Sequence, residues 1–511
     1  MQKINGIKLK TGESESLIKS KCARVAGVKE SEIKSFKILK KSLDARDKGN
    51  IFYTYNVEFS LFEEAEPPAI YPKAAGTVAV IGAGPCGLFC ALYLARCGIK
   101  PVIFERGESV ENRKKTCENF VKTGVLNENS NVQFGEGGAG AFSDGKLNTQ
   151  VNNARVTAAI RDFALFGAPQ EITYLSKPHI GSDKLPQTVK NIRLEIIRLG
   201  GEVKFNARVT DFCFENGALK GLEYEQNGKT EFFKCENCVV AAGHSARDLF
   251  EALYKKGVPM EQKPFAVGFR IEHLQSEISF SQYGKEYKRL PAADYKLVSH
   301  AGERDVFTFC MCPGGYVMPA ASEKDMLVVN GMSEYARNGT NANSALVCAV
   351  TPADFGGEDP LAGVRFQREI ERKAFLAGGG GYKAPVQKLG DFMKNKESFL
   401  FGEVLPTYPL KTHFYNLCEF YKKEMTNSFK NAILDMDKRL KGFYSPDAIL
   451  TGVESRTSSP LRILRGENGE SPLFAGLFPA GEGAGYAGGI ASAAADGIKT
   501  AFALAQKLSV E

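Results

Sequence analysis

Six residues early in the chain have the types and the spacing to bind a dinucleotide. They match the pattern G-x-G-x-x-G, which follows a β-branched run at Thr77 to Ile81 and precedes helix-like residues Leu88 to Cys97. Glycines at such a turn let backbone N–H groups approach a pyrophosphate at the N-terminus of a helix. The context of strand, turn and helix therefore predicts a dinucleotide site at Gly82, Ala83, Gly84, Pro85, Cys86 and Gly87.

An acidic residue stands where the adenosine ribose needs an acceptor. Glu105 lies eighteen residues after Gly87, at the end of the next expected strand, Pro101 to Phe104. In dinucleotide-binding βαβ units, a carboxylate at about this separation accepts hydrogen bonds from the ribose hydroxyls. We therefore expect Glu105 to bind ribose and Arg106 to lie beside the phosphates.

A second glycine cluster near the end of the chain favours FAD over NAD. Residues Gly481 to Ile490 read GEGAGYAGGI and precede an alanine-rich, helix-like run. Backbone donors and a helix N-terminus at this place would face the flavin. An NAD-binding domain does not need such a closing segment. A close-packed helix contact is the structural alternative. The glycine-rich loop 135–147, and Gly243 and His244 after an apolar strand, are expected to lie against the same cofactor.

Taken together, these segments resemble the uncharacterised FAD-dependent dehydrogenase family of bacteria. The resemblance rests on Gly82 to Gly87, Asn131 to Phe134 with the glycine loop that follows, Gly243 to Asp248, and Gly481 to Ile490. That family belongs to the wider glutathione-reductase-like flavoproteins with two dinucleotide-binding domains. The resemblance implies that FAD is surrounded by Glu105, Arg106, Arg113, Gly138, Ala139, Gly140, Ser143, Val209, Gly481, Glu482, Gly489 and Ile490. Glu482 stands where many of the wider group carry Asp, so its longer side chain must reach the ribityl hydroxyls differently.

Changes in composition divide the chain into four segments. Residues 1–71 contain a helix-like run and two β-like runs and end in a proline-rich linker, which indicates a small basic α/β domain. Residues 72–263 and 450–511 are expected to form one FAD-binding domain, interrupted by a β-rich cap or substrate domain at 264–449. The expected fold class is α/β, a discontinuous Rossmann-like domain with an inserted cap and a small N-terminal α+β domain.

Positive charge is concentrated at the N-terminus. Residues 1–50 contain thirteen Lys or Arg and six Asp or Glu, an excess of +7 that equals the formal charge of the whole chain. No RNA-binding or helix-turn-helix pattern accompanies it, so a solvated basic face is favoured and no nucleic-acid partner is expected. The longest apolar stretch, Thr77 to Ile99, contains four glycines, a proline and Arg96, which argues against a membrane span. The first residues do not resemble a signal peptide, and the cytoplasm is the expected location.

Cysteine and histidine spacing assigns no metal and no catalytic acid or base. Cys235 and Cys238 have ligand spacing, but the other close pair, Cys310 and Cys312, lies far along the chain. The five histidines have no partner visible by spacing, and His244 is the one nearest the expected cofactor.

Two further groups of residues have a structural and a chemical interpretation. Cys86 and Cys90 are expected to be buried packing residues of the phosphate-binding helix, although disulfide reductases of this fold class place a redox pair beside the flavin. Arg337, with Asn341 and Asn343 nearby, either orients a substrate in the cap or belongs to a surface hydrogen-bond network.

The sequence predicts an FAD-dependent oxidoreductase. A hydride would pass between flavin N5 and either a small-molecule substrate or a nicotinamide. No second strand-linked G-x-G-x-x-G is present, so NAD(P)H is expected only as a transient reductant. One alternative is an electron-transfer flavoprotein whose basic N-terminal domain docks a redox partner protein. The other is a binding or sensor protein in which FAD is structural.

Overall fold

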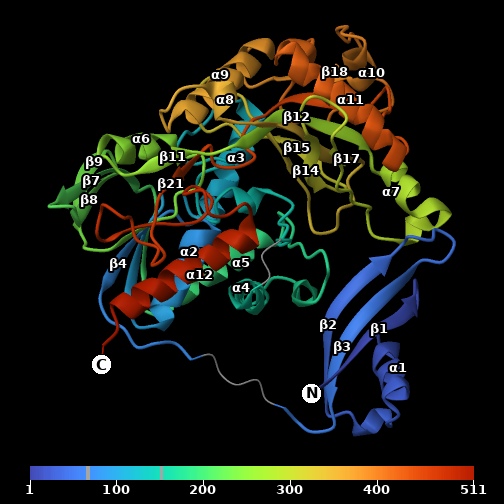
Figure 1. Cartoon of the computed structure of the whole chain (residues 1–511), viewed down its shortest axis with the longest axis horizontal. Helices are drawn as coiled ribbons and strands as arrows, with labels where there is room; N and C mark the ends of the chain where they lie inside the picture. Colours follow the sequence, from blue (N-terminus) through green and yellow to red (C-terminus); the bar gives the residue numbers. More distant parts are fainter. Residues whose placement is uncertain (65–69, 150–152, 511) are drawn as a thin grey trace.

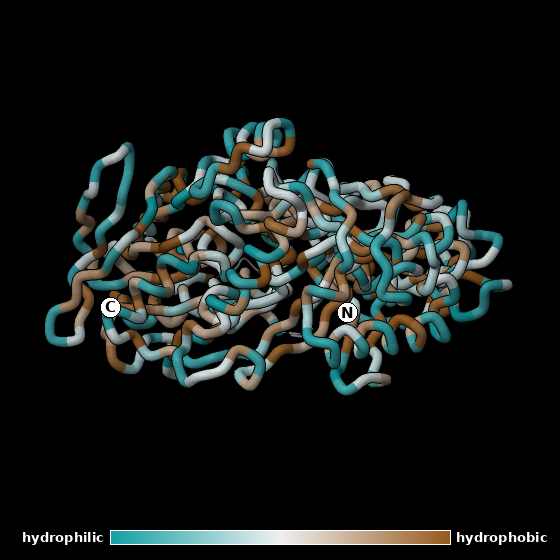
Figure 2. Tube along the Cα trace, turned by 90° about the horizontal axis from the view of Figure 1, so that it is seen from above, coloured by the Kyte–Doolittle hydropathy of each residue, from teal (hydrophilic) through white to brown (hydrophobic). Residues whose placement is uncertain are grey.

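Three units, each built around its own β-sheet, make up the molecule (Figure 1). The computed structural model describes residues 1–64, 70–149 and 153–510, so the expected proline-rich linker at 65–68 lies outside the described residues. In Figure 2, hydrophobic residues occur mainly on interior segments, whereas protruding loops are largely hydrophilic. None of the helices in the described ranges combines the length and the apolar character that a bilayer span requires.

A five-stranded parallel sheet forms the core of the dinucleotide-binding unit. Its strand order is β22-β10-β4-β5-β6, so the chain leaves the central strand β4 on one side and later returns on the other. The carboxyl ends of β4 and β10 therefore flank a topological switch point, where parallel sheets bind nucleotides. The strands are β4 (Thr77–Ile81), β5 (Lys100–Phe104), β6 (Glu202–Lys204), β10 (Cys238–Val240) and β22 (Leu477–Pro479).

Both faces of this sheet are covered, which explains its continuous apolar strands. Val78 and Val80 of β4 pack against helices, whereas Ala79 and Ile81 face an antiparallel meander on the opposite side. The helices on the first face are α2 (Pro85–Arg96), α4 (Ala154–Leu165), α5 (Leu185–Arg198) and α12 (Ile490–Lys507), and α3 (Val110–Thr123) lies nearby. The meander comprises β7 (Arg208–Glu215), β8 (Ala218–Gln226) and β9 (Lys229–Lys234).

The cap is a seven-stranded sheet with helices on the face away from the dinucleotide-binding unit (Figure 1). Its order is β13 (Val298–Ser299), β14 (Val306–Cys312), β17 (Asn341–Val350), β12 (Phe265–Leu274), β20 (Ile449–Glu454), β18 (Ala384–Lys388) and β19 (Thr412–Phe414). The helices on that face are α8 (Pro352–Phe355), α9 (Ala362–Ala377), α10 (Leu389–Met393) and α11 (Lys423–Arg439), whereas α7 (Gln275–Tyr283) lies at the end of the sheet next to the N-terminal unit (Figure 1). Two short ribbons complete it, β15 (Tyr316–Pro319) with β16 (Val329–Met332), and β11 (Met260–Gln262) with β21 (Leu461–Ile463).

The N-terminal unit is a three-stranded antiparallel sheet with one helix. Its order is β1-β3-β2, built from β1 (Gln2–Lys10), β2 (Ser35–Asp44) and β3 (Phe52–Ser60), and α1 (Leu17–Ala26) packs on it. Strand β2 reaches the rest of the molecule through backbone hydrogen bonds, because Lys41 N donates to Tyr174 O at 2.8 Å and Ser176 N donates to Lys41 O at 2.9 Å.

Two expectations about these elements need correction. The alternating pattern from Val203 to Val209 predicts a single strand, which is wrong: β6 and β7 are separate, because Asn206 between them has a left-handed φ of 52°. The expected boundary between 449 and 450 falls inside β20, which pairs with β12 and β18 of the cap sheet. The division of the chain into domains otherwise stays a proposal.

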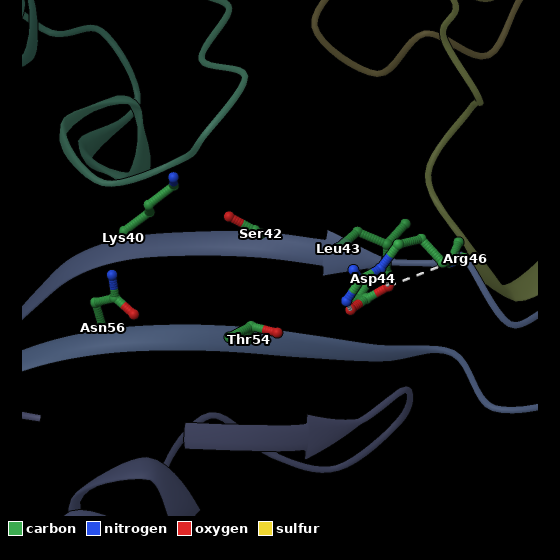
Figure 3. Close-up of a pocket in the computed structure, with 8 residues that line it drawn as sticks. Lys40, Ser42, Leu43, Asp44, Arg46, Thr54 and Asn56 are labelled. Atoms are coloured by element: carbon green, nitrogen blue, oxygen red, sulfur yellow. Dashed lines mark hydrogen bonds and ion pairs between the residues drawn. The ribbon is translucent and has the colours of Figure 1, made fainter. Parts of the chain in front are cut away.

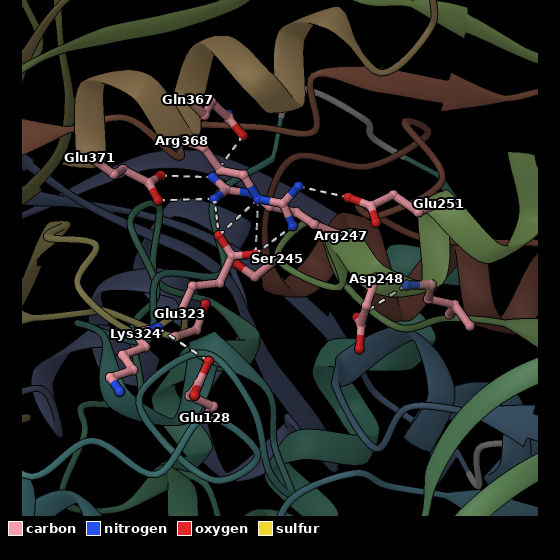
Figure 4. Close-up of polar contacts among 12 residues, drawn as sticks. Glu128, Ser245, Arg247, Asp248, Glu251, Glu323, Lys324, Gln367, Arg368 and Glu371 are labelled. Atoms are coloured by element: carbon pink, nitrogen blue, oxygen red, sulfur yellow. Dashed lines mark hydrogen bonds and ion pairs between the residues drawn. The ribbon is translucent and has the colours of Figure 1, made fainter. Parts of the chain in front are cut away.

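A buried ion network joins the cap to the dinucleotide-binding unit (Figure 4). Arg247 at the start of α6 (Arg247–Lys255) donates to Glu371 of α9 at 2.7 and 2.9 Å and to Glu323 at 2.7 Å. Arg456 donates to the same Glu371 carboxylate at 2.9 and 2.7 Å. Burial alone would raise the pKa of Glu371, but Arg247 and Arg456 hold it well below its usual range.

We predict that Glu371→Gln destabilises the protein by about 3–5 kcal/mol, because it leaves two buried guanidinium groups without their carboxylate. Urea unfolding followed by circular dichroism measures the loss. Glu251 is the matched control: its side chain is 37% exposed and pairs with Arg368, so Glu251→Gln should cost no more than about 1 kcal/mol. Equal losses for the two variants would contradict the assignment of Glu371 as the central link.

Candidate active site

A cavity of about 490 Å³ lies between the carboxyl ends of the parallel strands and the cap. On one side it is lined by Gly82 after β4, Glu105 after β5 and Ala242 after β10. On the other it is lined by cap residues, among them Cys310 of β14 and Glu454 of β20. We call this the main cavity. Its position is the one at which a doubly wound sheet binds a dinucleotide and its substrate.

Most residues predicted to bind the cofactor line the main cavity. These are Gly82, Gly84, Pro85, Cys86, Glu105, Arg106, Gly138, Ala139, Gly140, Ser143, Val209, Gly243, His244, Glu482, Gly489 and Ile490. Ala83, Gly87, Arg113 and Gly481 lie behind this lining. The structure thus brings together segments that are about 400 residues apart in the chain, while direct cofactor contact stays a prediction.

The glycines provide a test of whether FAD fits. A Cβ added at Gly243, Gly488 or Gly489 would meet no protein atom within 4 Å, so each glycine opens directly onto the cavity. Helix α2 begins beside it with no side chain capping its first N–H groups, which leaves them free for a phosphate. Gly87 has a packing reason instead, since a Cβ there would lie 1.9 Å from Gly82 O. The residues present therefore fit a dinucleotide with its pyrophosphate at α2.

Glu105 organises the turn at which the adenosine end is expected. Its carboxylate accepts hydrogen bonds from Ala83 N at 2.8 Å, Gly107 N at 2.9 Å and Gly135 N at 3.0 Å. A carboxylate has about four acceptor positions, so these three bonds leave room for a ribose hydroxyl. Glu105 therefore fastens the glycine turn to the loop after α3 and still faces the cavity.

Arg113, expected near the cofactor, does not line the main cavity. It is fully buried behind the glycine loop and donates to five backbone oxygens there, at 2.7–3.2 Å. The acceptors are the carbonyl oxygens of Asn131, Val132, Gly135, Glu136 and Gly138. Burial lowers the pKa of Arg113. Its role in the structure is to hold the loop that lines the cavity, because it gives a hydrogen bond to each of these buried carbonyl groups.

His244 and Glu482 both line the cavity, and burial shifts their pKa values in opposite directions. Burial, together with the nearby Arg456 and Arg247, lowers the pKa of His244 to about 3, and its Nε2 lies 3.0 Å from Arg456 O. The imidazole is therefore neutral at physiological pH, so no imidazolium is present to donate a proton. Burial raises the pKa of Glu482 to about 7, against the opposing charge of Lys263.

The cap side of the cavity contains ionisable residues that the sequence did not indicate. Glu454 is 5% exposed, and burial raises its pKa to about 7 although Arg270 Nη1 lies 3.3 Å from its Oε2. Tyr295 is 7% exposed, and its hydroxyl has no hydrogen-bond partner in the described structure. Lys146, within the glycine-rich loop 135–147, lies 2.9 Å from Asp144. No motif marks Glu454 or Tyr295, because they reach the cavity only when the cap folds over the sheet.

Neither interpretation of Arg337, Asn341 and Asn343 describes their position. Arg337 pairs with the buried Asp144 at 2.5 Å, and Asn343 accepts a hydrogen bond from Arg270 at 2.6 Å. Asn341 and Asn343 are buried, and none of the three lines the main cavity. Arg337 supports the cavity-lining Asp144 from behind, and Asn343 contacts Arg270, which in turn donates to the cavity-lining Glu454.

A second hollow, of about 370 Å³, lies on the N-terminal sheet (Figure 3). Side chains of β2 and β3 line it, including Lys40, Ser42, Thr54 and Asn56. Its charged residues Asp44 and Arg46 pair with each other at 2.5 Å. It contains no thiol or imidazole, so the main cavity is the better candidate for chemistry.

Comparison with known proteins agrees with this geometry. Residues 76–268 match the pyridine nucleotide-disulphide oxidoreductase family, and residues 264–457 match the family described as FAD-dependent protein, C-terminal domain-like. Residues 1–60 match a domain of unknown function. A protein of Clostridium beijerinckii, described as an uncharacterized protein, is 46% identical over 532 residues, which cover 99% of each chain. The chain belongs to this family of FAD-dependent oxidoreductases.

Solved structures with a similar arrangement are distant from this oxidoreductase. Glycerol-3-phosphate dehydrogenase from Bacillus halodurans, complexed with FAD, is 11% identical with a TM-score of 0.39, over 86% of this chain and 66% of that one. A triple mutant of the flavin-dependent brominase Bmp2 is 12% identical with a TM-score of 0.38, over 85% and 81% of the two chains.

We predict that Gly84→Ala weakens FAD binding roughly tenfold or more, about 1.4 kcal/mol. The added Cβ lies 3.8 Å from Gly138 Cα, which the protein tolerates, but it occupies the approach to the pyrophosphate. Titration of the apoprotein with FAD, followed by flavin fluorescence, measures the change. Gly49→Ala, on an exposed turn away from the cavity, is the control and should bind FAD normally. Normal binding by Gly84→Ala would show that the phosphates lie elsewhere.

Proposed function

We propose that this oxidoreductase transfers a hydride between a small-molecule substrate, or a nicotinamide, and FAD in the main cavity. One observation supports this proposal: glycine-rich segments that fit the cofactor and ionisable cap side chains line the same 490 Å³ space. A substrate held between them would lie against both the flavin and a proton-carrying group. A cytoplasmic location and the glutathione-reductase-like subtype are part of the same proposal.

When bound, FAD supplies the two-electron chemistry at flavin N5. The chain's own residues bind and orient the reactants. Gly138 to Ser143 and Gly489 to Ile490 would hold the flavin end, while Glu105 would hold the adenosine end. The cap excludes water from the reacting face, which strengthens the electrostatic interactions inside the cavity.

Glu454 is the best placed residue to move a proton. Its carboxyl faces the cavity from the end of β20, and a pKa of about 7 lets it both hold and release a proton near neutral pH. His244 is held neutral, Lys146 is bonded to Met311 O and paired with Asp144, and Glu482, whose pKa is also about 7, belongs to the glycine segment expected to hold the flavin end. A hydride transfer that creates or removes a hydroxyl or amino proton on the substrate would therefore use Glu454.

We expect the FAD-loaded protein to be reduced by NADH or NADPH under anaerobic conditions. The measurement is the loss of the oxidised-flavin absorption bands after each nucleotide is added. A nicotinamide would use the cavity only transiently, since the one G-x-G-x-x-G site of the sequence is assigned to FAD. Bands that persist with both nucleotides, but bleach with a redox partner protein, would favour the electron-transfer alternative. Bands that persist with every donor would favour structural FAD.

The pH dependence of turnover should report Glu454. In the direction of substrate reduction, the rate should fall as pH rises through about 7, because the carboxyl loses the proton it donates; in the oxidation direction the rate should rise. Glu454→Gln should remove this inflection and lower kcat by roughly 10²-fold or more. Glu261→Gln changes a half-exposed carboxylate paired with Arg462 and should leave the profile unchanged. An unchanged inflection in Glu454→Gln would exclude this residue as the proton carrier.

A further inference from the structure

Two cysteines of the cap face the cavity that is proposed to contain FAD. Cys310 and Cys312 lie at the end of β14, separated by Met311, and all three residues line the main cavity. Cys310 is exposed, whereas Cys312 is 1% exposed. Resting on the proposed FAD site, we infer that Cys310 and Cys312 form a redox-active dithiol/disulfide pair that exchanges electrons with FAD.

The backbone at this pair departs from a regular strand. β14 pairs with β17 at Phe309 and again at Cys312, with a register shift between them that leaves an extra residue on β14. Cys310 has a left-handed φ of 41°, a conformation that is uncommon for residues other than glycine and is concentrated at functional sites. Bulges of this kind often change the direction in which a side chain points beside an active site.

The two residues lie close together at this bulge. Cys312 Sγ donates to Cys310 O at 3.3 Å, so its thiol already lies against the residue with which it would pair. Because the register shift frees residues 310 and 311 from the ladder, closing the bond would break no strand hydrogen bond there.

Two cations surround the pair and favour thiolate chemistry. Arg270 is fully buried, and its Nη2 donates to Cys310 O at 3.0 Å and contacts Cys312 Sγ at 3.6 Å. Lys146 donates to Met311 O, between the two cysteines. The exposed surface of Cys310 opens onto the cavity, but the protein around it raises the pKa of its thiol to about 12, while Lys146 and Arg270 act to lower it. The Cys310 thiol therefore rests protonated, in a site whose positive charge stabilises a thiolate as it forms.

The cysteines within the phosphate-binding helix do not offer the same arrangement. Cys86 and Cys90 are both buried in α2, and Cys90 is absent from the cavity lining. Burial raises the pKa of both thiols well above the usual range. Their predicted role as packing residues agrees with these positions, and the pair on the cap is the one with access to the flavin face.

The exchange balances without another reactant. Two S–H bonds break and one S–S bond forms, while two electrons and two protons pass to FAD. In the reverse direction the reduced cofactor returns them, the S–S bond breaks and both thiols are restored. The pair would thus store a second electron pair beside the flavin, with Cys310 as the sulfur that a disulfide or thiol entering the cavity reaches first.

Peptide mapping tests the bond directly. Trypsin should release Asp305 to Lys324, which contains Cys310 and Cys312 and no other cysteine. In the FAD-loaded, air-oxidised full chain, we expect this peptide to resist alkylation and to be lighter by about 2 Da, the two hydrogens lost in disulfide formation. After anaerobic reduction with dithionite it should take two alkyl groups. A peptide that is fully alkylated in both states would overturn the inference.

Reductive titration tests the exchange with FAD. Anaerobic dithionite should deliver two more electrons per FAD to the unaltered protein than to Cys310→Ser, because that variant lacks the second two-electron couple. Cys310 is exposed, so its replacement should not disturb folding, and Cys312→Ser provides a second variant. Cys418→Ser removes a half-buried thiol that does not line the cavity and should behave like the unaltered protein. Equal electron uptake by Cys310→Ser and the unaltered protein would overturn the proposal.

These tests are separate from that of the proposed function. Neither requires a substrate or a nicotinamide, so the disulfide can fail to form in a protein whose flavin is bleached by NADH. Conversely, a disulfide that exchanges electrons with FAD can be present in a protein that neither nucleotide reduces.

Discussion

The placement of the cap over the dinucleotide-binding unit depends on one buried carboxylate. Glu371 of the cap helix α9 lies between Arg247, at the start of α6, and Arg456, which follows the cap strand β20. All three side chains are almost completely removed from water. Charges of this kind are tolerated only when every member is paired, so the network has one favourable arrangement and a high cost for others. This makes the cap a fixed wall of the cavity.

One arginine of this network, Arg456, also connects it to the cavity. Arg456 lines the main cavity and its backbone oxygen lies against His244, so the position of the cap also determines the state of that imidazole. On the opposite wall, Arg113 holds the glycine loop through carbonyl oxygens alone. A flexible glycine-rich loop thereby acquires a defined shape without placing large side chains where a cofactor must fit.

Arg270 has a comparable role inside the cap. It contacts Glu454, Asn343 and the segment from Cys310 to Cys312. Glu454 and the two cysteines are ionisable groups on the cap side of the main cavity. Its single positive charge therefore acts on a carboxyl group and on two thiols. In a low-dielectric cavity such a shared charge couples the protonation of one group to the chemistry of the other.

The sequence alone determined the parts of the site that depend on short stretches of backbone. A β-branched strand, a glycine turn and a helix predicted β4, α2 and the cavity-lining Gly82, Gly84, Pro85 and Cys86, because phosphate binding requires close backbone approach within one βαβ unit. The spacing to Glu105 was sufficient to place it at the same crevice. The α/β fold class followed from the same alternation of strands and helices, and the family matches agree with FAD as the cofactor.

Only the tertiary structure decided which distant side chains share the cavity. Glu454 and Tyr295 carry no local signal, and Cys310 with Cys312 were noted only as a close pair too far from Cys235 and Cys238 to complete a metal site. Arg113, expected at the cofactor, lies behind the loop instead. The physical reason is that these positions are set by the packing of two sheets and by buried charge pairs between them, interactions of long sequence separation that no local pattern encodes.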